Sequence, residues 1–201
     1  LDGVDVAVTS TGIGGPSAAI AVEELHQCGA DTMMRVGTCA SVSPKVSIGD
    51  IVIPNGAVKM EGVSNHYLPV EFPSVPDFQM LKAIEQAAMN LGYPYDVGVT
   101  ITKASFYTQT SPETKPVGPE LIYKWESYKK GGASSTSMEC APLFAVGASL
   151  GIRTSCVMAS ATNYESGKVK EGAEKMDIED RAIRTAIEAM KLIIRNDQKG
   201  E

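Results

Sequence analysis

The stretch VDVAVTSTGIGGPSAAIAVEELHQCG, residues 4–29, decides the fold class. Its first part, Val4–Thr9, is an apolar run that predicts a β-strand, and Ser10–Ser17 is a glycine-rich turn. Ala18–Cys28 then has the residue pattern of a helix that ends at Gly29. A strand, a glycine-rich turn and a helix in this order are typical of an α/β domain, in which helices cover a sheet.

The same alternation continues along the rest of the chain. Further strands are predicted at Thr32–Val36, Asp50–Pro54, Val97–Thr102 and Ile152–Ala161. Further helices are predicted at Asp77–Gly92, Glu120–Lys130, Ala141–Leu150 and Ile178–Ile194, with a surface loop at Ser111–Pro119. This order predicts a single α/β domain over residues 1–201, a three-layer αβα sandwich with a central mixed, largely parallel sheet.

The composition is that of a globular protein and argues against several functional classes. The chain has 201 residues, 43% of them hydrophobic, so it can bury a core without a disulfide or a metal. Its net charge of −6 argues against a nucleic-acid surface. No apolar run reaches the roughly 18 residues of a membrane span, and no signal-peptide pattern is present. The four cysteines are isolated, so we expect no zinc site and a cytoplasmic location.

Two segments near predicted strand ends have the chemistry to bind a small anion, because ligands of α/β sheets collect there. The glycines between Thr9 and Ser17 would let backbone N–H groups approach an anion, although such turns also serve tight packing alone. Arg35 needs an anionic partner, and Thr38 adds a hydroxyl donor. A structural pair between Arg35 and a carboxylate is the alternative.

Two further segments have the chemistry to bind a sugar and a planar ring. Glu139 precedes an apolar helix, where a carboxylate accepts hydrogen bonds from a diol or simply favours the helix N-terminus. Met138 beside it would give an apolar wall. Phe106 and Gln109 suit a heterocycle, because a ring stacks on the aromatic and the amide offers a paired donor and acceptor. A core aromatic with an exposed glutamine is the alternative.

Taken in order, these segments resemble the nucleoside phosphorylase-I family, and within it the uridine phosphorylase branch. The resemblance runs over almost the whole chain and rests on STGIGGPSAAIAVEEL (10–25), RVGT (35–38), IGDIVIP (48–54), HYLPVEFPSVPDF (66–78), VGVT (97–100), FY (106–107) and SMEC (137–140). It implies reversible phosphorolysis of a nucleoside, with uridine foremost, to a free base and ribose 1-phosphate. Phosphate would be a co-substrate, and no cofactor is implied.

The resemblance also implies a role for individual residues. Phosphate would be held by Gly12, Arg35 and Thr38, ribose by Thr38, Met138 and Glu139, and the base by Cys39, Ala40, Phe106, Gln109 and Asn163. Arg35 and Glu139 would be the catalytic residues. Ile13 and Ser17 match positions that in some relatives help to bind a monovalent cation such as K⁺ between subunits. A homo-oligomer is implied, either a dimer or a hexamer built as a trimer of dimers. Nucleoside and phosphate would be its partners, with no nucleic acid and no membrane.

Several positions depart from the family pattern. The family begins with a strand and a loop carrying GDP-x-R, and this chain starts after that point, so we expect a domain without them. Ser137 stands where the branch has a glutamate, no arginine follows Gln109, and Tyr164 stands where many relatives have arginine. A nucleosidase, a purine nucleoside phosphorylase and a non-catalytic nucleoside-binding protein therefore stay open. Arg35 with Thr38 favours phosphate over water, and the lack of an aspartate near Asn163 weighs against a purine.

Overall fold

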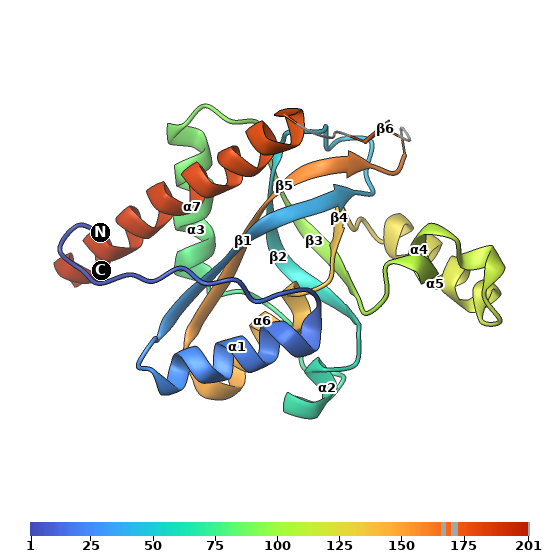
Figure 1. Ribbon diagram of the computed structural model, residues 1–201, viewed down its shortest axis with the longest axis horizontal. Coiled ribbons are helices and arrows are strands. Elements are labelled where there is room, and N and C mark those ends of the chain that lie inside the picture. Colours follow the sequence, from blue (N-terminus) through green and yellow to red (C-terminus); the bar gives the residue numbers. More distant parts are fainter. Residues whose placement is uncertain (166–167, 170–172, 201) are drawn as a thin grey trace.

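The computed structural model describes residues 1–165, 168–169 and 173–200. Within this part of the chain, six strands form one central sheet (Figure 1). The strands are β1 (Thr32–Ser41), β2 (Ile51–Met60), β3 (Tyr95–Lys103), β4 (Ser135–Ser137), β5 (Arg153–Asn163) and β6 (Lys168–Val169). The helices are α1 (Gly15–Gln27), α2 (Ser64–Tyr67), α3 (Phe78–Asn90), α4 (Tyr107–Thr110), the 3₁₀-helix η1 (Pro112–Thr114), α5 (Gly118–Lys130), α6 (Cys140–Leu150) and α7 (Ala173–Lys199).

The sheet is mixed and closes on itself. The strand order is β1-β4-β3-β2-β5-β6, and β1 also pairs with β5. The pairs β1–β5, β2–β3 and β3–β4 are parallel, whereas β1–β4, β2–β5 and β5–β6 are antiparallel. The predicted α/β class and mixed sheet are therefore confirmed. The plain three-layer sandwich needs correction, because the short strand β4 pairs with both β1 and β3 and completes a ring of five strands.

Helices cover two sides of this ring. Figure 1 shows α1 and α6 on one side and α3 and α7 on the other, whereas α4 and α5 project at one end. One core cluster joins α1 and α6 to the strands and includes Val22, Phe144 and Met158. A second joins α3 and α7 to the strands and includes Ile84 and Val157. Burial of these apolar faces stabilises the fold.

Helix α6 is apolar on every side because it is buried on every side over Cys140–Gly147. At Gly147 an added Cβ would lie within 2.4 Å of the Thr154 hydroxyl, so only glycine lets the helix approach β5 this closely. The helix begins at Cys140, one residue before the predicted start, with Glu139 as its N-cap. The tight packing therefore fixes the position of Glu139.

The predicted strand at Val4–Thr9 is wrong. These residues form no strand, and Val8 is 99% exposed. Strand β5 pairs along the whole of one edge of β1, and β4 pairs with the other edge only at Ala40 and Ser41; the segment forms no ladder with the rest of that edge. It instead runs along the surface, where Arg195 Nε donates to the Asp2 carboxylate at 2.9 Å (Figure 1).

The other predicted elements are confirmed with shifted ends. Strand β1 continues five residues past the predicted Val36 to Ser41, and α7 is longer than Ile178–Ile194 at both ends. The predicted surface loop at Ser111–Pro119 contains η1 and the first two residues of α5. The short elements α2, α4, β4 and β6 were not predicted, because two to four residues show no periodicity. Among the described residues no helix has the length and apolarity needed to cross a bilayer.

Candidate active site

Arg35, Glu139 and Gly14 meet at one point although they come from three different elements. Arg35 Nη2 on β1 donates to Glu139 Oε2 at 2.5 Å. The other carboxylate oxygen, Oε1, accepts from the backbone N–H of Gly14 at 2.9 Å, in a buried position. A carboxylate that binds both a guanidinium and a backbone amide is strongly oriented, because charge-assisted hydrogen bonds are the strong ones.

The turn before α1 has a backbone that requires glycine. Gly12 and Gly14 have φ angles of +70° and +88°, in the left-handed region. An added Cβ at Gly12 would lie 2.9 Å from the Ser17 hydroxyl, which donates to the Thr11 carbonyl. The turn thus directs the Gly14 N–H into the site, at the start of a helix whose N-terminus favours anions.

Arg35 is held by its own strand and by its neighbour. An added Cβ at Gly37 would lie 2.9 Å from Arg35 Nη1, so the guanidinium lies over Gly37. Arg35 Nη1 also lies 3.7 Å from Cys156 Sγ on β5. Burial alone lowers the pKa of Arg35, but Cys156, Cys140 and Glu139 outweigh burial and raise it above its ordinary value. The group is therefore a fixed cation.

Two further predicted residues border this pair. Met138 is half-buried, and its Cε would lie 3.9 Å from a Cβ added at Gly14. Its backbone N–H donates to Glu139 Oε2 at 3.2 Å. Thr38 is half-buried on β1, and its hydroxyl makes no hydrogen bond within the described chain. No hydrogen bond or ion pair joins Thr38 to Arg35, so the structure places the two on one strand without bringing their side chains together.

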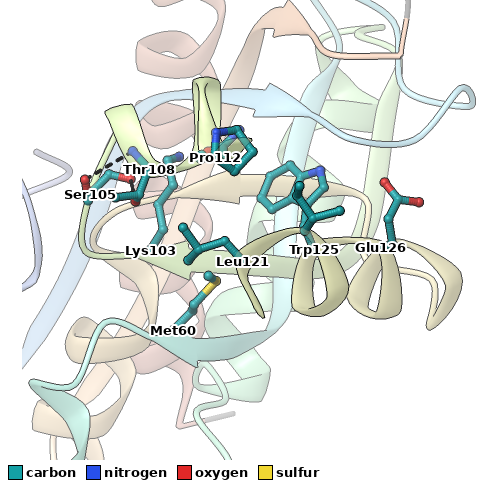
Figure 2. Close-up of a pocket in the computed structure, with 10 residues that line it drawn as sticks. Met60, Lys103, Ser105, Thr108, Pro112, Leu121, Trp125 and Glu126 are labelled. Carbon is teal, nitrogen blue, oxygen red and sulfur yellow. Dashed lines mark hydrogen bonds between the residues drawn. The ribbon is translucent and has the colours of Figure 1, made fainter. Parts of the chain in front are cut away.

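The predicted base-binding residue Gln109 lines a separate pocket of about 240 Å³, and Phe106 directly follows Ser105, which also lines it. Figure 2 shows this pocket. Its lining residues are Met60, Lys103, Ser105, Thr108, Gln109, Pro112, Leu121, Ile122, Trp125 and Glu126. Phe106 is 50% exposed at the start of α4, with its ring 5.5 Å from that of Tyr107 and edge-on to it. Gln109 Oε1 is buried and has no partner in the described part of the chain. An unpartnered buried acceptor is a common mark of a ligand position.

The other predicted base-binding residues have structural partners. Cys39 is buried, and burial raises the pKa of its thiol to about 12. Ala40 pairs with Thr136 across β1 and β4. Asn163 Nδ2 donates to the Ser41 hydroxyl at 2.9 Å and to the Val46 carbonyl at 2.8 Å. The Asn163 amide therefore anchors the segment after β1, and its predicted contact with a base stays a prediction.

Sequence reasoning missed Lys103, which lines the pocket, and the contact of Tyr164 with the lining residue Trp125. Lys103, at the end of β3, is only 6% exposed, and its Nζ donates to Thr136 Oγ1 at 3.1 Å. Burial lowers the pKa of Lys103 to about 8, although Glu139 and Cys39 favour its charged form. Tyr164 packs edge-on against Trp125 with ring centroids 6.2 Å apart. The signal available for Lys103 was its position at the end of an apolar strand, next to Phe106. Nothing in the sequence marked the contact of Tyr164 with Trp125.

The expected cation site rests on Ile13 and Ser17. Ile13 is 79% exposed, and the Ser17 hydroxyl is engaged with the Thr11 carbonyl. Ile13 and Ser17 alone do not supply the set of oxygen ligands that a cation requires, so the expected cation site stays a prediction. Within the described residues no group of three or more His, Cys, Asp or Glu side chains is arranged to hold a metal.

Comparison with known proteins decides the family. A family model described as the phosphorylase superfamily matches residues 1–195. The chain belongs to the phosphorylase superfamily. It is 43% identical to a uridine phosphorylase of Treponema pallidum over 96% of this chain and 74% of that protein. It is 37% identical to a uridine phosphorylase of Thermococcus kodakarensis over 99% of this chain and 71% of that protein. It is 35% identical to a guanosine phosphorylase of Halorubrum lacusprofundi over 94% of this chain and 77% of that protein.

The predicted resemblance to the nucleoside phosphorylase family and to its uridine phosphorylase branch is thereby confirmed. The match includes the glycine turn, β1 with Arg35 and the N-terminus of α6 with Glu139, because all three lie within residues 1–195. The structure adds that these superfamily segments converge on one ion pair.

Proposed function

We propose that this chain catalyses the reversible phosphorolysis of a nucleoside, with uridine as the preferred substrate. The observation that carries the proposal is the contact of Arg35 with Glu139 and of Glu139 with the Gly14 N–H. This contact puts a fixed cation and a helix N-terminus, which favour phosphate, beside a carboxylate that suits sugar hydroxyls. The similarity to uridine phosphorylases over most of the chain supports the choice of reaction.

The proposed reaction needs a phosphate held beneath the anomeric carbon of the sugar. Phosphate would bind at the turn around Gly12 and at Arg35, with the unpartnered hydroxyl of Thr38 as a further donor. A phosphate oxygen then forms a bond to the anomeric carbon while the bond from that carbon to the base breaks. Positioning of the two reactants and electrostatic stabilisation supply the rate, without a covalent enzyme intermediate.

Glu139 would connect the phosphate and the ribose. Its carboxylate is oriented by Arg35, Gly14 and the Met138 N–H, and Oε1, which accepts only from Gly14, keeps a second lone pair for a ribose hydroxyl. Met138 would give the apolar wall beside the sugar. Because the same carboxylate touches the phosphate-binding arginine, sugar and phosphate would bind interdependently. Arg35 and Glu139 are thus the proposed catalytic residues.

The base would lie toward Phe106 and Gln109, with the backbone of Cys39 and Ala40 and the side chain of Asn163 at its border. The exposed ring of Phe106 supports stacking, and the unpartnered Oε1 of Gln109 supports recognition of an N–H on the base. These roles are part of the proposal.

We also propose that the chain forms a homo-oligomer. Val8, Ile13 and Ile20 are 99%, 79% and 59% exposed in and after the N-terminal segment, and clustered exposed apolar residues favour association. A monovalent cation between subunits at Ile13 and Ser17 would need oxygen atoms from a second copy. Light scattering on a sizing column, with and without K⁺, tests both statements.

A purine nucleoside is the second candidate, because one relative of 35% identity is a guanosine phosphorylase. The test incubates the purified chain with uridine, thymidine, inosine and guanosine, each with and without phosphate, and separates free base from nucleoside by chromatography. We expect phosphate-dependent release of uracil. Release of guanine alone would favour the second candidate, release without phosphate a nucleosidase, and no release a nucleoside-binding protein.

A further inference from the structure

Lys103 is a buried cation without a counter-ion. Its residue exposure is 6%, and no carboxylate of the described chain lies within 4.0 Å of its Nζ. Its one hydrogen bond within the described residues runs to the Thr136 hydroxyl at 3.1 Å, so two of the three N–H groups have no partner in that part of the chain. Burial of an ammonium group with a single neutral partner costs free energy. The cost needs an explanation, and a bound ligand provides one.

Lys103 lines the pocket drawn in Figure 2. Gln109 lines the same pocket. Lys103 Nζ lies 6.0 Å from the centre of the Phe106 ring, the proposed stacking surface for the base. Gln109 Oε1 in the same pocket is buried and has no hydrogen-bond partner among the described residues.

Among its polar lining residues, which also include Ser105, Thr108 and Glu126, the pocket thus offers a charged donor in Lys103 and a buried, unpartnered neutral acceptor in Gln109. A ring edge that carries a carbonyl beside an N–H is complementary to this pair, because the carbonyl accepts from an ammonium and the N–H donates to an amide oxygen. Uracil, hypoxanthine and guanine have such an edge. Cytosine and adenine carry an amino group beside a bare ring nitrogen, which would oppose donor to donor and acceptor to acceptor.

We propose that Lys103 binds a carbonyl oxygen of the base and stabilises the negative charge that the base acquires as it departs, beside Gln109, which accepts from the adjacent N–H. This inference rests on the proposed function. As the glycosidic bond breaks, its electron pair passes to the base and spreads to the carbonyl oxygen, while a phosphate oxygen bonds to the anomeric carbon. A preformed cation in a dry site stabilises that charge strongly. Lys103 gives up no proton in this step.

The test compares Lys103→Met with the wild type on two substrates that differ in the leaving group. Uridine and 5-fluorouridine have the same edge, but the fluorinated base carries negative charge more readily. The variant should lose about 100-fold in kcat/KM on uridine and clearly less on 5-fluorouridine. Lys103→Arg should recover part of the loss on uridine. Wild type should not cleave cytidine appreciably.

The matched control is Lys124→Met, the same substitution on a lysine of α5 that is exposed and paired with Glu120. It should leave kcat/KM on both substrates unchanged. An equal loss on both substrates, or none, would overturn the role of Lys103 while leaving the proposed function intact. A wild type that cleaves no nucleoside would overturn both. Should Lys103→Met not fold, Lys103→Gln replaces it in the same comparison.

Discussion

Arg35 and Glu139 lie 104 residues apart in the sequence, and their side chains meet at 2.5 Å. The contact joins the first strand of the sheet to the N-cap of its most buried helix. The sequence left two interpretations of Arg35, a phosphate ligand and half of a structural ion pair. The structure contains the pair, and the pair also contacts the glycine turn through Gly14. The two interpretations are therefore compatible, and experiments on Arg35 have to separate stability from phosphate binding.

Replacing Arg35 by glutamine should remove most of the dependence on phosphate. Glutamine keeps a donor near Glu139 but loses the charge and the planar fork that match phosphate. We expect kcat/KM for phosphate to fall by about 100-fold. Initial rates at several phosphate concentrations, with thermal unfolding alongside, measure this.

Arg153→Gln is the control for that variant. Arg153 lies on the neighbouring strand and is paired with Asp197 at 2.7 Å, at one third exposure. Its substitution should lower the melting temperature slightly and leave the phosphate dependence unchanged. If folded Arg35→Gln kept the wild-type response to phosphate, Arg35 would be a purely structural residue.

Gly37→Ala should move the guanidinium without removing it. The new Cβ would lie 2.9 Å from Arg35 Nη1, too close for the present rotamer. We expect the KM for phosphate to rise roughly tenfold, since a small misplacement of a binding group is costly. Gly56→Ala on β2 is the matched control, because its Cβ would meet no atom closer than 3.8 Å. Equal kinetics for the two variants would contradict the account of this strand.

Lys103→Met should stabilise the folded protein near neutral pH. In wild type, burial lowers the folded-state pKa of Lys103 from 10.5 to about 8, so the buried charge opposes folding at pH values below about 8. Between those two pKa values the unfolded state binds more protons, and this penalty fades as pH rises. We expect an advantage of roughly 1–3 kcal/mol for the variant at pH 7, shrinking toward pH 10. Urea unfolding at both pH values tests it; a variant less stable at pH 7 would refute it.

The wild-type activity on uridine should fall as the pH rises through about 8, because Lys103 then loses its proton. Glu139 and Cys39 are the charged or titratable groups that favour its protonated form. In Lys103→Arg the same fall should move to higher pH, since arginine stays charged. A profile that is identical in the two proteins would show that another group titrates.

The four cysteines should differ sharply in reactivity. Cys28 is exposed, whereas Cys39, Cys140 and Cys156 are buried. Burial also raises the pKa of Cys39 to about 12, which leaves almost no thiolate at pH 8. Iodoacetamide should therefore label Cys28 alone until denaturant is added, as peptide mass spectrometry would show. Cys28→Ser is the control and should take up no label while folded.

Much of this fold follows from local pattern, and the exceptions have physical causes. The helix from Phe78 to Asn90 was predicted from its Asp77 cap and apolar spacing, and Asp77 does accept from Met80 N–H at 2.8 Å. The strand predicted at Val4–Thr9 fails because a strand depends on a partner, which sequence periodicity cannot provide. Strand β4 was missed because three polar residues show no periodic pattern, although their pairing with β1 and β3 completes the ring of strands.

The candidate site likewise contains residues that the sequence predicted and one that it did not. Motif resemblance selected Arg35 and Glu139, and the structure brings them together. Lys103 carried no motif, and its one hydrogen bond runs to Thr136, which lies 33 residues further along the chain. Asn163 shows the converse, because its amide is engaged with the segment after β1. Long-range contacts of this kind are set by topology and are invisible to spacing rules.

The central claim is that a nucleoside is split by phosphate at the Arg35–Glu139 pair. Phosphorus NMR of a mixture of this chain, uridine and inorganic phosphate tests it most directly. The account predicts that the inorganic phosphate signal is replaced by that of a sugar 1-phosphate, in a one-to-one ratio with the uracil formed, and that Arg35→Gln abolishes the exchange. Uracil formed while the phosphate signal stays unchanged would contradict it.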